Sequence, residues 1–454
     1  SFNTNNMTSI YTIPYWLKKT KTKNQLFLFN WKNNKSVIIY DENHPANTLS
    51  EQKIIQRENF YSEEYLSDID WLIESSFLQL ESEKKEENFT PKKKISQQEL
   101  HLIILPAGEA CNLNCVYCYE NHNYKKRMND SDSDRLISFI KKQGSELVNI
   151  EYFGGEPMLN MKFIEDFSKK LTKNKIKYHA GITTNGTLLS KQNLEKLHKS
   201  GVKSFQITID GARNLHNKLR ISNSKNLNSY ESVCNALKNI QQSCHSDINC
   251  VVRINSNKET IQKENLSTFI KDIKNIIPPD DHRFLIFPKP IGDYLSANLK
   301  DNSKAQSTYC DKSSANEVTE ILEKAFFNQG YLLADPIMLT KNKGYACYAG
   351  NENSFVINPD FYIYKCTVAL DDPINNVGKI LEDGSLSINE NFHLWTKDYS
   401  NESCGDCFAN KTCTGNSCPL INIKLNEKKC PPFKNQIDST TFKLVKFYER
   451  VSNA

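Results

Sequence analysis

The chain has 454 residues, of which 38% are hydrophobic, so it can bury a large core and global disorder is not expected. Its net charge of +5 is small and comes from scattered lysines, which argues against a nucleic-acid-binding protein. No stretch approaches about 18 consecutive apolar residues, and the first residues do not resemble a signal peptide. We therefore expect a cytoplasmic protein of two or three domains that does not contact a membrane.

Residues 1–82 are predicted to form a small domain of strands followed by a helix. Residues 24–41 (NQLFLFNWKNNKSVIIYD) contain two apolar strands around the turn KNNK. Residues 62–80 have helical apolar spacing, with Ser62 as a candidate N-cap. A charged linker is expected over residues 83–100.

Residues 101–308 alternate six short apolar runs with amphipathic segments of helical spacing. This alternation is typical of an α/β fold with parallel strands, in which functional residues lie at the carboxyl ends of the strands. A helical bridge is expected over residues 309–344, a cysteine-rich domain over 345–433 and a C-terminal helix over 434–454. The cysteine-rich segment is short and rich in loops, so we expect it to need an inorganic group for stability.

Polar or glycine-bearing segments follow five consecutive strands. The first strand leads into CxxxCxxC, the second into GGEP at residues 154–157, and the third into Asn185. The fourth ends at Thr208 and Asp210, and the fifth at Arg253 and Asn255. Because the carboxyl ends of parallel strands share one edge, these segments predict a single shared site.

The CxxxCxxC segment contains Cys111, Cys115 and Cys118. Three thiolates can bind three irons of a [4Fe–4S] cluster and leave the fourth iron open to another ligand. The alternative is a zinc site completed by His122.

CxxxCxxC with an aromatic residue, Tyr117, before its last cysteine resembles the radical S-adenosylmethionine (SAM) superfamily. The resemblance implies a partial (β/α)6 barrel in which SAM chelates the fourth iron. It also implies that Gly154, Gly155, Glu156 and Pro157 bind the methionine amino group. The positions that match ribose or carboxylate contacts, each of which could instead cap a helix or end a strand, are Asn185, Thr208, Asp210, Arg253 and Asn255. His216 and Arg220 also fit the family pattern, with structural roles left open.

The C-terminal cysteines are similar in order and spacing to the SPASM domain of radical SAM enzymes, which carries two auxiliary [4Fe–4S] clusters. The resemblance implies an outer cluster on Cys404, Cys407, Cys413 and Cys430. It implies an inner cluster on Cys347, Cys366 and Cys418, whose fourth position is either open or filled by Cys310. The chain departs from the family in having Phe361 where glycine is usual, Asn353 where some relatives have a cysteine, and four residues instead of three between Cys413 and Cys418. The alternative for the block is a pair of zinc sites.

Radical SAM enzymes cleave SAM to methionine and a 5′-deoxyadenosyl radical, and SPASM relatives mostly modify peptides or proteins. The N-terminal region looks like a winged-helix domain that binds the leader of a precursor peptide, or it is a structural cap on the barrel. We therefore expect a peptide maturase that installs a cross-link or another oxidation and takes electrons from flavodoxin or ferredoxin. The alternatives are a sulfatase-maturing oxidase and a non-catalytic iron–sulfur sensor. No catalytic base is identified, and the cavity-lining candidates around the sixth strand are Arg283, Lys289 and Asp293.

Overall fold

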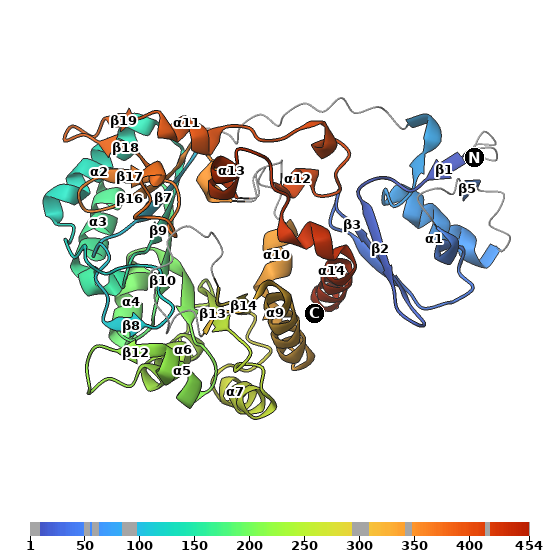
Figure 1. Ribbon diagram of the computed structural model, residues 1–454, viewed down its shortest axis with the longest axis horizontal. Coiled ribbons are helices and arrows are strands. Elements are labelled where there is room, and N and C mark those ends of the chain that lie inside the picture. Colours follow the sequence, from blue (N-terminus) through green and yellow to red (C-terminus); the bar gives the residue numbers. More distant parts are fainter. Residues whose placement is uncertain are drawn as a thin grey trace. The chain divides into compact units, whose positions relative to one another are not determined.

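The computed structural model describes residues 10–49, 55–56, 63–83, 98–292, 308–340, 347–413 and 418–453 (Figure 1). The chain divides into two compact units. The first unit comprises Ser1–Ile95, Pro336–Cys347 and Asp398–Ala454, and the second comprises Ser96–Asp335 and Tyr348–Lys397. Each unit is described by itself.

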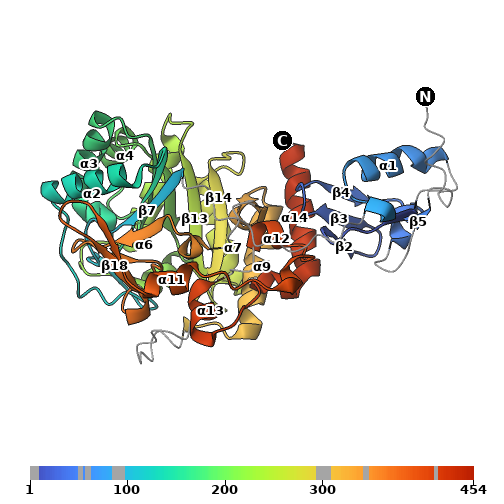
Figure 2. The same ribbon diagram turned by 90° about the horizontal axis from the view of Figure 1, so that it is seen from above.

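The second unit is built on an 11-stranded sheet with eight consecutive parallel strands, six of which alternate with helices (Figures 1 and 2). These six are β7 (Glu99–Ile104), β9 (Leu147–Tyr152), β10 (Tyr178–Thr184), β11 (Val202–Thr208), β13 (Asn249–Ser256) and β14 (Phe284–Pro290). All six coincide with the predicted apolar runs, and the α/β class with a parallel sheet is confirmed. Burial alternates along β9 and β13, so one face of these strands is fully buried and the other is half-buried or exposed.

Helices connect these strands, and consecutive helices pack against one another. They are α2 (Asp130–Gln143), α3 (Met161–Lys173), α4 (Lys191–Lys199), α6 (Ser229–Gln242) and α7 (Lys263–Ile276), followed by α9 (Lys312–Asn328) against β14. The local sequence sets their ends. Asn129 and Asp132 form a reciprocal capping box at the start of α2, and Gly144 ends it in the left-handed region.

Part of the cysteine-rich segment extends the same sheet. Strand β16 (Ser354–Ile357) pairs in parallel with β7, and an antiparallel meander continues from it. The meander consists of β17 (Tyr362–Tyr364), β18 (Asn376–Ile380) and β19 (Leu386–Ile388), followed by α11 (Asn391–Thr396). On the other edge, β15 (Leu332–Leu333) pairs in parallel with β14 and leads into α10 (Ala334–Thr340).

The first unit combines N-terminal strands with the C-terminal helix. Its sheets are β2–β3–β4 (Leu17–Lys21, Leu26–Asn30, Ser36–Ile39) and β5–β1–β6 (Ile55–Gln56, Ile10–Thr12, Gln79–Leu80). Helix α14 (Ile437–Ser452) packs on the first of these sheets. Their shared core contains Phe27, Phe29, Trp31, Leu444 and Val445, so residues more than 400 positions apart fold together.

The predicted N-terminal helix is shorter than expected. Helix α1 spans Glu63–Glu74, whereas the apolar spacing predicted helix as far as residue 80. The chain leaves the helix because Ser76 adopts φ 62° and Phe77 is fully buried, after which residues 79–80 join the small sheet. The proposed cap Ser62 and most of the predicted linker lie outside the described residues.

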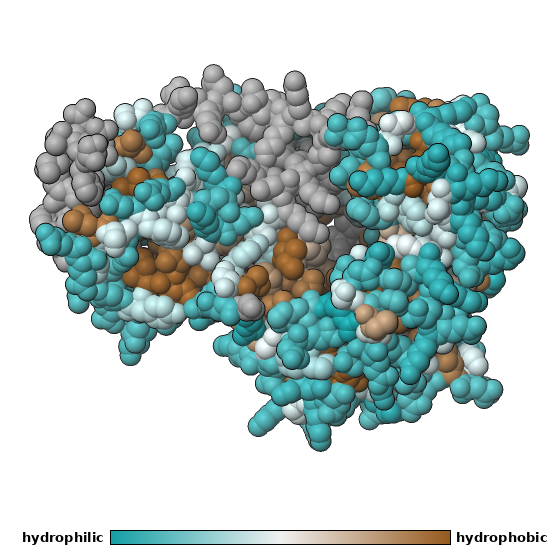
Figure 3. Space-filling model, turned by 180° about the vertical axis from the view of Figure 1, so that it is seen from behind, coloured by the Kyte–Doolittle hydropathy of each residue, from teal (hydrophilic) through white to brown (hydrophobic). Residues whose placement is uncertain are grey.

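The surface is mostly hydrophilic on the face shown in Figure 3, with scattered hydrophobic patches. Among the described residues, no helix is long and apolar enough to cross a membrane.

Candidate active site

The three cysteines lie in the loop between β7 and α2. Within this loop β8 (Leu113–Cys115) pairs with β12 (Arg220–Ser222), which places Cys115 opposite Arg220. All three thiols are partly buried, and burial raises the pKa of Cys111 to about 12. A buried thiolate is costly without a cation beside it, and a metal ion supplies that cation. These side chains are therefore suited to bind a metal such as iron, which replaces the thiol protons.

The two glycines of GGEP are required by the cysteine loop itself. A Cβ at Gly154 would stand 2.3 Å from the Gly108 carbonyl oxygen, and one at Gly155 would stand 2.2 Å from that of Ala110. The Gly155 and Glu156 amides donate to these same two carbonyls at 3.3 and 2.8 Å. The backbone of residues 108–110 fills the space where a side chain at either position would stand, so the two glycines seat the cysteine loop against β9.

Glu156 is fully buried and links two strand ends. Its Oε1 accepts from the Met158 amide and the Thr184 hydroxyl at 3.0 and 2.8 Å, and its Oε2 accepts from the Asn185 amide at 2.8 Å. Burial raises the pKa of Glu156, and these hydrogen bonds oppose the rise. The carboxylate therefore fixes the geometry of the site in addition to any contact with a ligand.

Asn185 connects the end of β10 to the cysteine loop. Its Nδ2 donates to the Asn112 Oδ1 at 2.8 Å and lies 3.8 Å from the Cys111 sulfur. Sequence reasoning missed Asn112, because an isolated asparagine inside a loop carries no local signal for a partner 73 residues away.

Tyr117 is the centre of a buried polar network. Its hydroxyl donates to the Asp210 carboxylate and accepts from Arg220 Nη1 at 2.8 Å and from Asn255 Nδ2 at 2.9 Å. Asp210 also accepts from the Asn255 amide at 2.9 Å and lies 3.7 Å from the Arg220 guanidinium. The network joins the cysteine loop to the ends of β11 and β13, so four of the predicted residues meet around one phenol.

The remaining predicted residues surround this network. Arg253 donates to the Asn255 Oδ1 at 2.9 Å, and Thr208 is buried as the last residue of β11. The buried His216 accepts from the Asp210 amide through Nδ1, which makes it a positioning residue for that carboxylate.

The candidates around the sixth strand are not all at this edge. Arg283 immediately precedes β14 and donates to Asp281 and to the Gln241 carbonyl, so it lies at the amino end of the strand. Arg283 therefore does not line the cavity expected at the carboxyl ends of the strands. Lys289 lies at the carboxyl end of β14, paired in register with Asn255, and Asp293 falls outside the described residues.

The zinc alternative depends on His122. Its Nδ1 lies 2.7 Å from the Glu109 carbonyl oxygen, while its Nε2 is buried and has no hydrogen-bond partner among the described residues. The Nδ1 contact fixes the His122 ring beside the cysteine loop.

In the first unit, four cysteines line one hollow of ≈ 320 Å³, a volume that includes the solvent at its mouth. They are the four residues predicted for the outer cluster: Cys404, Cys407, Cys413 and Cys430. Two lysines lie beside their sulfurs. Lys428 Nζ is 3.3 Å from the Cys404 sulfur, and Lys434 Nζ is 3.8 Å from that of Cys430. Four thiols around one hollow are the ligand set of a [4Fe–4S] cluster, and the two lysine ammonium groups beside two of the sulfurs balance the negative charge of such a centre.

The inner ligand set stays a prediction, because Cys347 and Cys418 belong to the first unit and Cys366 to the second. Locally, Cys366 is held by Asn375, whose Oδ1 accepts from its amide at 2.9 Å and whose Nδ2 donates to its carbonyl at 2.7 Å. Phe361 adopts φ 62°, which explains why the family usually has glycine there. The Cys310 thiol lies 3.5 Å from the Ser256 carbonyl oxygen.

Comparison with known proteins agrees with this geometry. Residues 105–264 match the model of the radical SAM superfamily. The chain is 26% identical over 364 residues to a cysteine-type anaerobic sulfatase-maturating enzyme from Clostridium novyi, covering 76% of this chain and 92% of that protein. A protein of the same description from Clostridium perfringens strain 13 is 22% identical over 338 residues, covering 70% and 88%.

The fold is also similar to a solved structure described as native anSMEcpe with bound AdoMet. The TM-score is 0.57 at 19% sequence identity, and the match covers 78% of this chain and 98% of that chain. A second structure of native anSMEcpe, with bound AdoMet and Cp18Cys peptide, gives a TM-score of 0.55 with the same identity and coverage.

Proposed function

This chain is a radical SAM enzyme, and we propose that it modifies a peptide substrate by abstracting hydrogen from an unactivated carbon. The observation that carries the proposal is the convergence of the cysteine loop with the ends of β9, β10, β11 and β13. The family implies a [4Fe–4S] cluster and SAM, which together supply the 5′-deoxyadenosyl radical when bound.

The residues of this edge have distinct proposed tasks. Cys111, Cys115 and Cys118 hold three irons and leave the fourth for SAM. The GGEP segment and Asn185 bind the methionine part of SAM, and Thr208, Asp210, Arg253 and Asn255 contact its ribose or carboxylate. Because Glu156 and Tyr117 are tied into buried networks, the site is formed before the ligand arrives, which lowers the cost of binding.

The cysteine-rich segment is proposed to carry two auxiliary clusters, which gives three [4Fe–4S] clusters in all. The four thiols around the hollow in the first unit support the outer cluster. The inner cluster rests on the family resemblance, with an open position or Cys310 as its fourth ligand. Auxiliary clusters suit this chemistry because removal of a hydrogen atom leaves an electron to be accepted.

The proposed substrate is a ribosomally made precursor peptide whose leader is recognised by residues 1–82. The fold match to anSMEcpe covers 98% of that chain but leaves more than a fifth of this chain unmatched, which is the share that an added recognition element would occupy. Within the part of the chain that the structure describes, β2 and β4 are the outer strands of the N-terminal meander, and an extended peptide can add to a sheet beside such a strand.

A second candidate is the maturation of a sulfatase by oxidation of a cysteine or serine to formylglycine. It is favoured by the relative from Clostridium novyi, which this chain matches over 92% of its length. The same radical site serves either substrate, so the distinction lies in the peptide that is bound.

Mass spectrometry after an anaerobic reaction with SAM and dithionite separates the two candidates. A precursor peptide encoded beside the gene should become lighter by the mass of two hydrogen atoms, and deletion of its leader should abolish the change. A sulfatase-type peptide should instead gain an aldehyde that a hydrazide reagent traps. Formation of the aldehyde with no change in the precursor would replace the first candidate by the second.

A further inference from the structure

Two histidines and an aspartate gather at the end of the parallel sheet that is remote from the cysteine loop. His198 lies in the last turn of α4, shortly before β11 begins at Val202. His245 and Asp247 lie in the loop between α6 and β13, which begins at Asn249. The group is therefore at the amino ends of β11 and β13, whereas the radical site is at their carboxyl ends.

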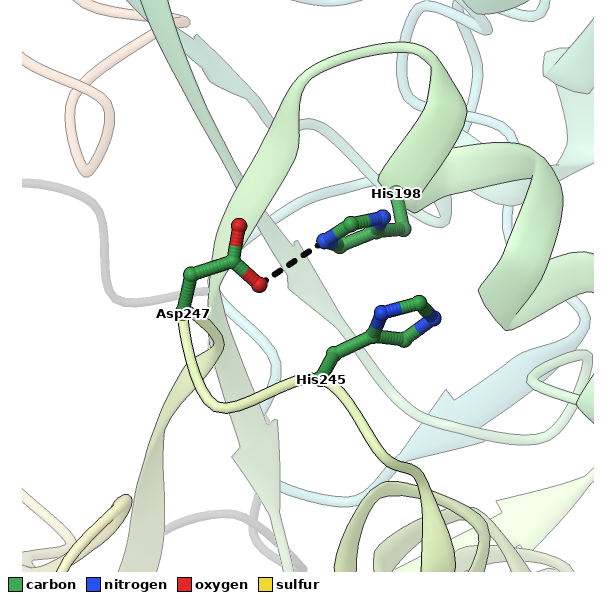
Figure 4. A group of neighbouring side chains, drawn as sticks. All are labelled: His198, His245 and Asp247. Atoms are coloured by element: carbon green, nitrogen blue, oxygen red, sulfur yellow. Dashed lines mark hydrogen bonds and ion pairs between the residues drawn. The ribbon is translucent and has the colours of Figure 1, made fainter.

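The three side chains are arranged with their polar atoms close together (Figure 4). The imidazole rings of His198 and His245 are stacked, with centroids 3.7 Å apart and planes 16° from parallel. His198 Nε2 lies 2.9 Å from the Asp247 Oδ1. One potential ligand atom from each residue lies within 4.8 Å of the other two, and two imidazoles with a carboxylate are a donor set that zinc and related ions prefer.

Glu195 orients the second imidazole. His245 Nε2 lies 2.8 Å from the Glu195 Oε1, which assigns the proton of the neutral ring to Nε2 and leaves Nδ1 with a lone pair. In Figure 4 the two nitrogens of His245 point to different sides, one of them toward the His198–Asp247 pair. A carboxylate on the far nitrogen of a metal-binding histidine is the usual outer contact of such sites.

The loop that presents His245 and Asp247 is held by a half-buried arginine. Arg283 donates to the carbonyls of Gln241, Ser243 and His245 at 2.8, 3.2 and 3.0 Å. Asp281 pairs with the same guanidinium at 2.7 Å. These hydrogen bonds fix the backbone that presents His245 without a metal.

A cation beside the group limits the way in which a metal can bind. Lys203 Nζ lies 2.7 Å from the Asp247 Oδ2, and with Lys203 in place a metal can use only Oδ1 of that carboxylate. The ammonium also opposes the charge of the metal, so affinity is expected to be lower than for a site without it.

We infer that His198, His245 and Asp247 form a binding site for a divalent transition metal ion of the zinc class, with water in the remaining positions. Binding replaces the His198–Asp247 hydrogen bond by two metal–ligand bonds, and the single proton of the neutral His198 ring moves from Nε2 to Nδ1. The ion joins α4 to the α6–β13 loop and so stabilises this end of the sheet.

Equilibrium dialysis of the iron-replete protein against Zn²⁺ tests this inference, with bound zinc counted by mass spectrometry. Thiols that hold iron do not compete. The wild type and the control H179Q, an exposed histidine on β10, should bind one more zinc per chain than H198Q/H245Q. Equal zinc in all three proteins, or none in the wild type, overturns the inference.

A second, milder variant keeps the inference testable if the double variant misfolds. E195Q leaves all three ligands in place and removes only the outer carboxylate, so it should weaken zinc binding by about 10–100-fold. Zinc should also raise the thermal unfolding midpoint of the wild type and not that of H198Q/H245Q. Unchanged zinc affinity in E195Q would contradict the assigned role of Glu195, and an equal thermal shift in both proteins would overturn the site.

Discussion

Replacement of Arg220 by methionine tests the buried network beside the cysteine loop. The Asp210 side chain is fully buried and that of Arg220 is 10% exposed, with a closest N–O distance of 3.7 Å. Methionine has a similar length and no charge, so Asp210 would keep the Tyr117 hydroxyl and the Asn255 amide but lose its cation. Removal of one partner from a buried ion pair typically destabilises a protein by about 3–5 kcal/mol.

The chain offers a matched control in Arg213, which pairs with Glu231 at 2.6 Å. Both side chains of this pair are at least half exposed, at 50% and 58%. Exposed pairs contribute at most about 1 kcal/mol because solvent screens them. Distance alone would rank the Arg213 pair as the stronger one; burial predicts the opposite order.

The assay is urea unfolding of R220M and R213M, followed by far-UV circular dichroism, with iron measured in the folded fraction. R220M should lose several times more free energy of unfolding than R213M. It should also retain less iron, because β12 pairs with the strand that carries Cys115. Equal destabilisation by the two variants would refute the role given to the buried network.

Further predictions concern four other contacts. Burial holds the pKa of His216 well below its usual value near 6.5, so the stability that its neutral ring contributes is present above about pH 6.5 and is lost as the pH falls. The variant H216N keeps an acceptor for the Asp210 amide and should flatten the fall of the thermal unfolding midpoint between about pH 6.5 and 5. An unchanged dependence of the midpoint on pH would count against this. G155A should lower the iron content sharply. G144A has nothing within 4 Å of its added Cβ, so it should lose only about 1–2 kcal/mol of free energy of unfolding and no iron. Loss of iron in both variants would contradict the packing argument. K428M/K434M should lower the midpoint potential of the outer cluster by tens of millivolts in an EPR titration, because it removes two N–H···S contacts. The control is K446M on α14. Equal midpoint potentials in the two variants would exclude a role for these contacts. C310A should keep all its iron if the inner cluster has an open position; loss of iron would assign Cys310 as a ligand.

The parallel strands and their helices were predictable because each is a local pattern. The buried face of each strand is recorded in a short apolar run, and the chain order fixes which residues follow that run. That reasoning also predicts which strand end carries the site. It fails for Arg283, because β14 begins one residue later, at Phe284, and leaves Arg283 at the amino end of the strand.

The contacts that sequence reasoning missed are long-range. Helix α14 packs on strands at the other end of the chain, and β12 pairs with β8 across more than 100 residues, without a local signal for either. The motif GGEP was recognised in the sequence, but the close approach of residues 108–110 to its glycines depends on how the cysteine loop packs. Phe361 departs from the family residue yet keeps the left-handed backbone, which a sequence pattern does not reveal.

The most direct test of the central claim is the formation of 5′-deoxyadenosine by the iron-replete protein in anaerobic buffer with SAM and dithionite. We predict roughly twelve irons per chain, as expected for three [4Fe–4S] clusters. We also predict 5′-deoxyadenosine from the wild type and none from C111A/C115A/C118A, which should retain the iron of its auxiliary clusters. No 5′-deoxyadenosine from iron-replete wild type, or equal amounts from both proteins, would contradict the assignment of the cysteine loop as the SAM-binding centre.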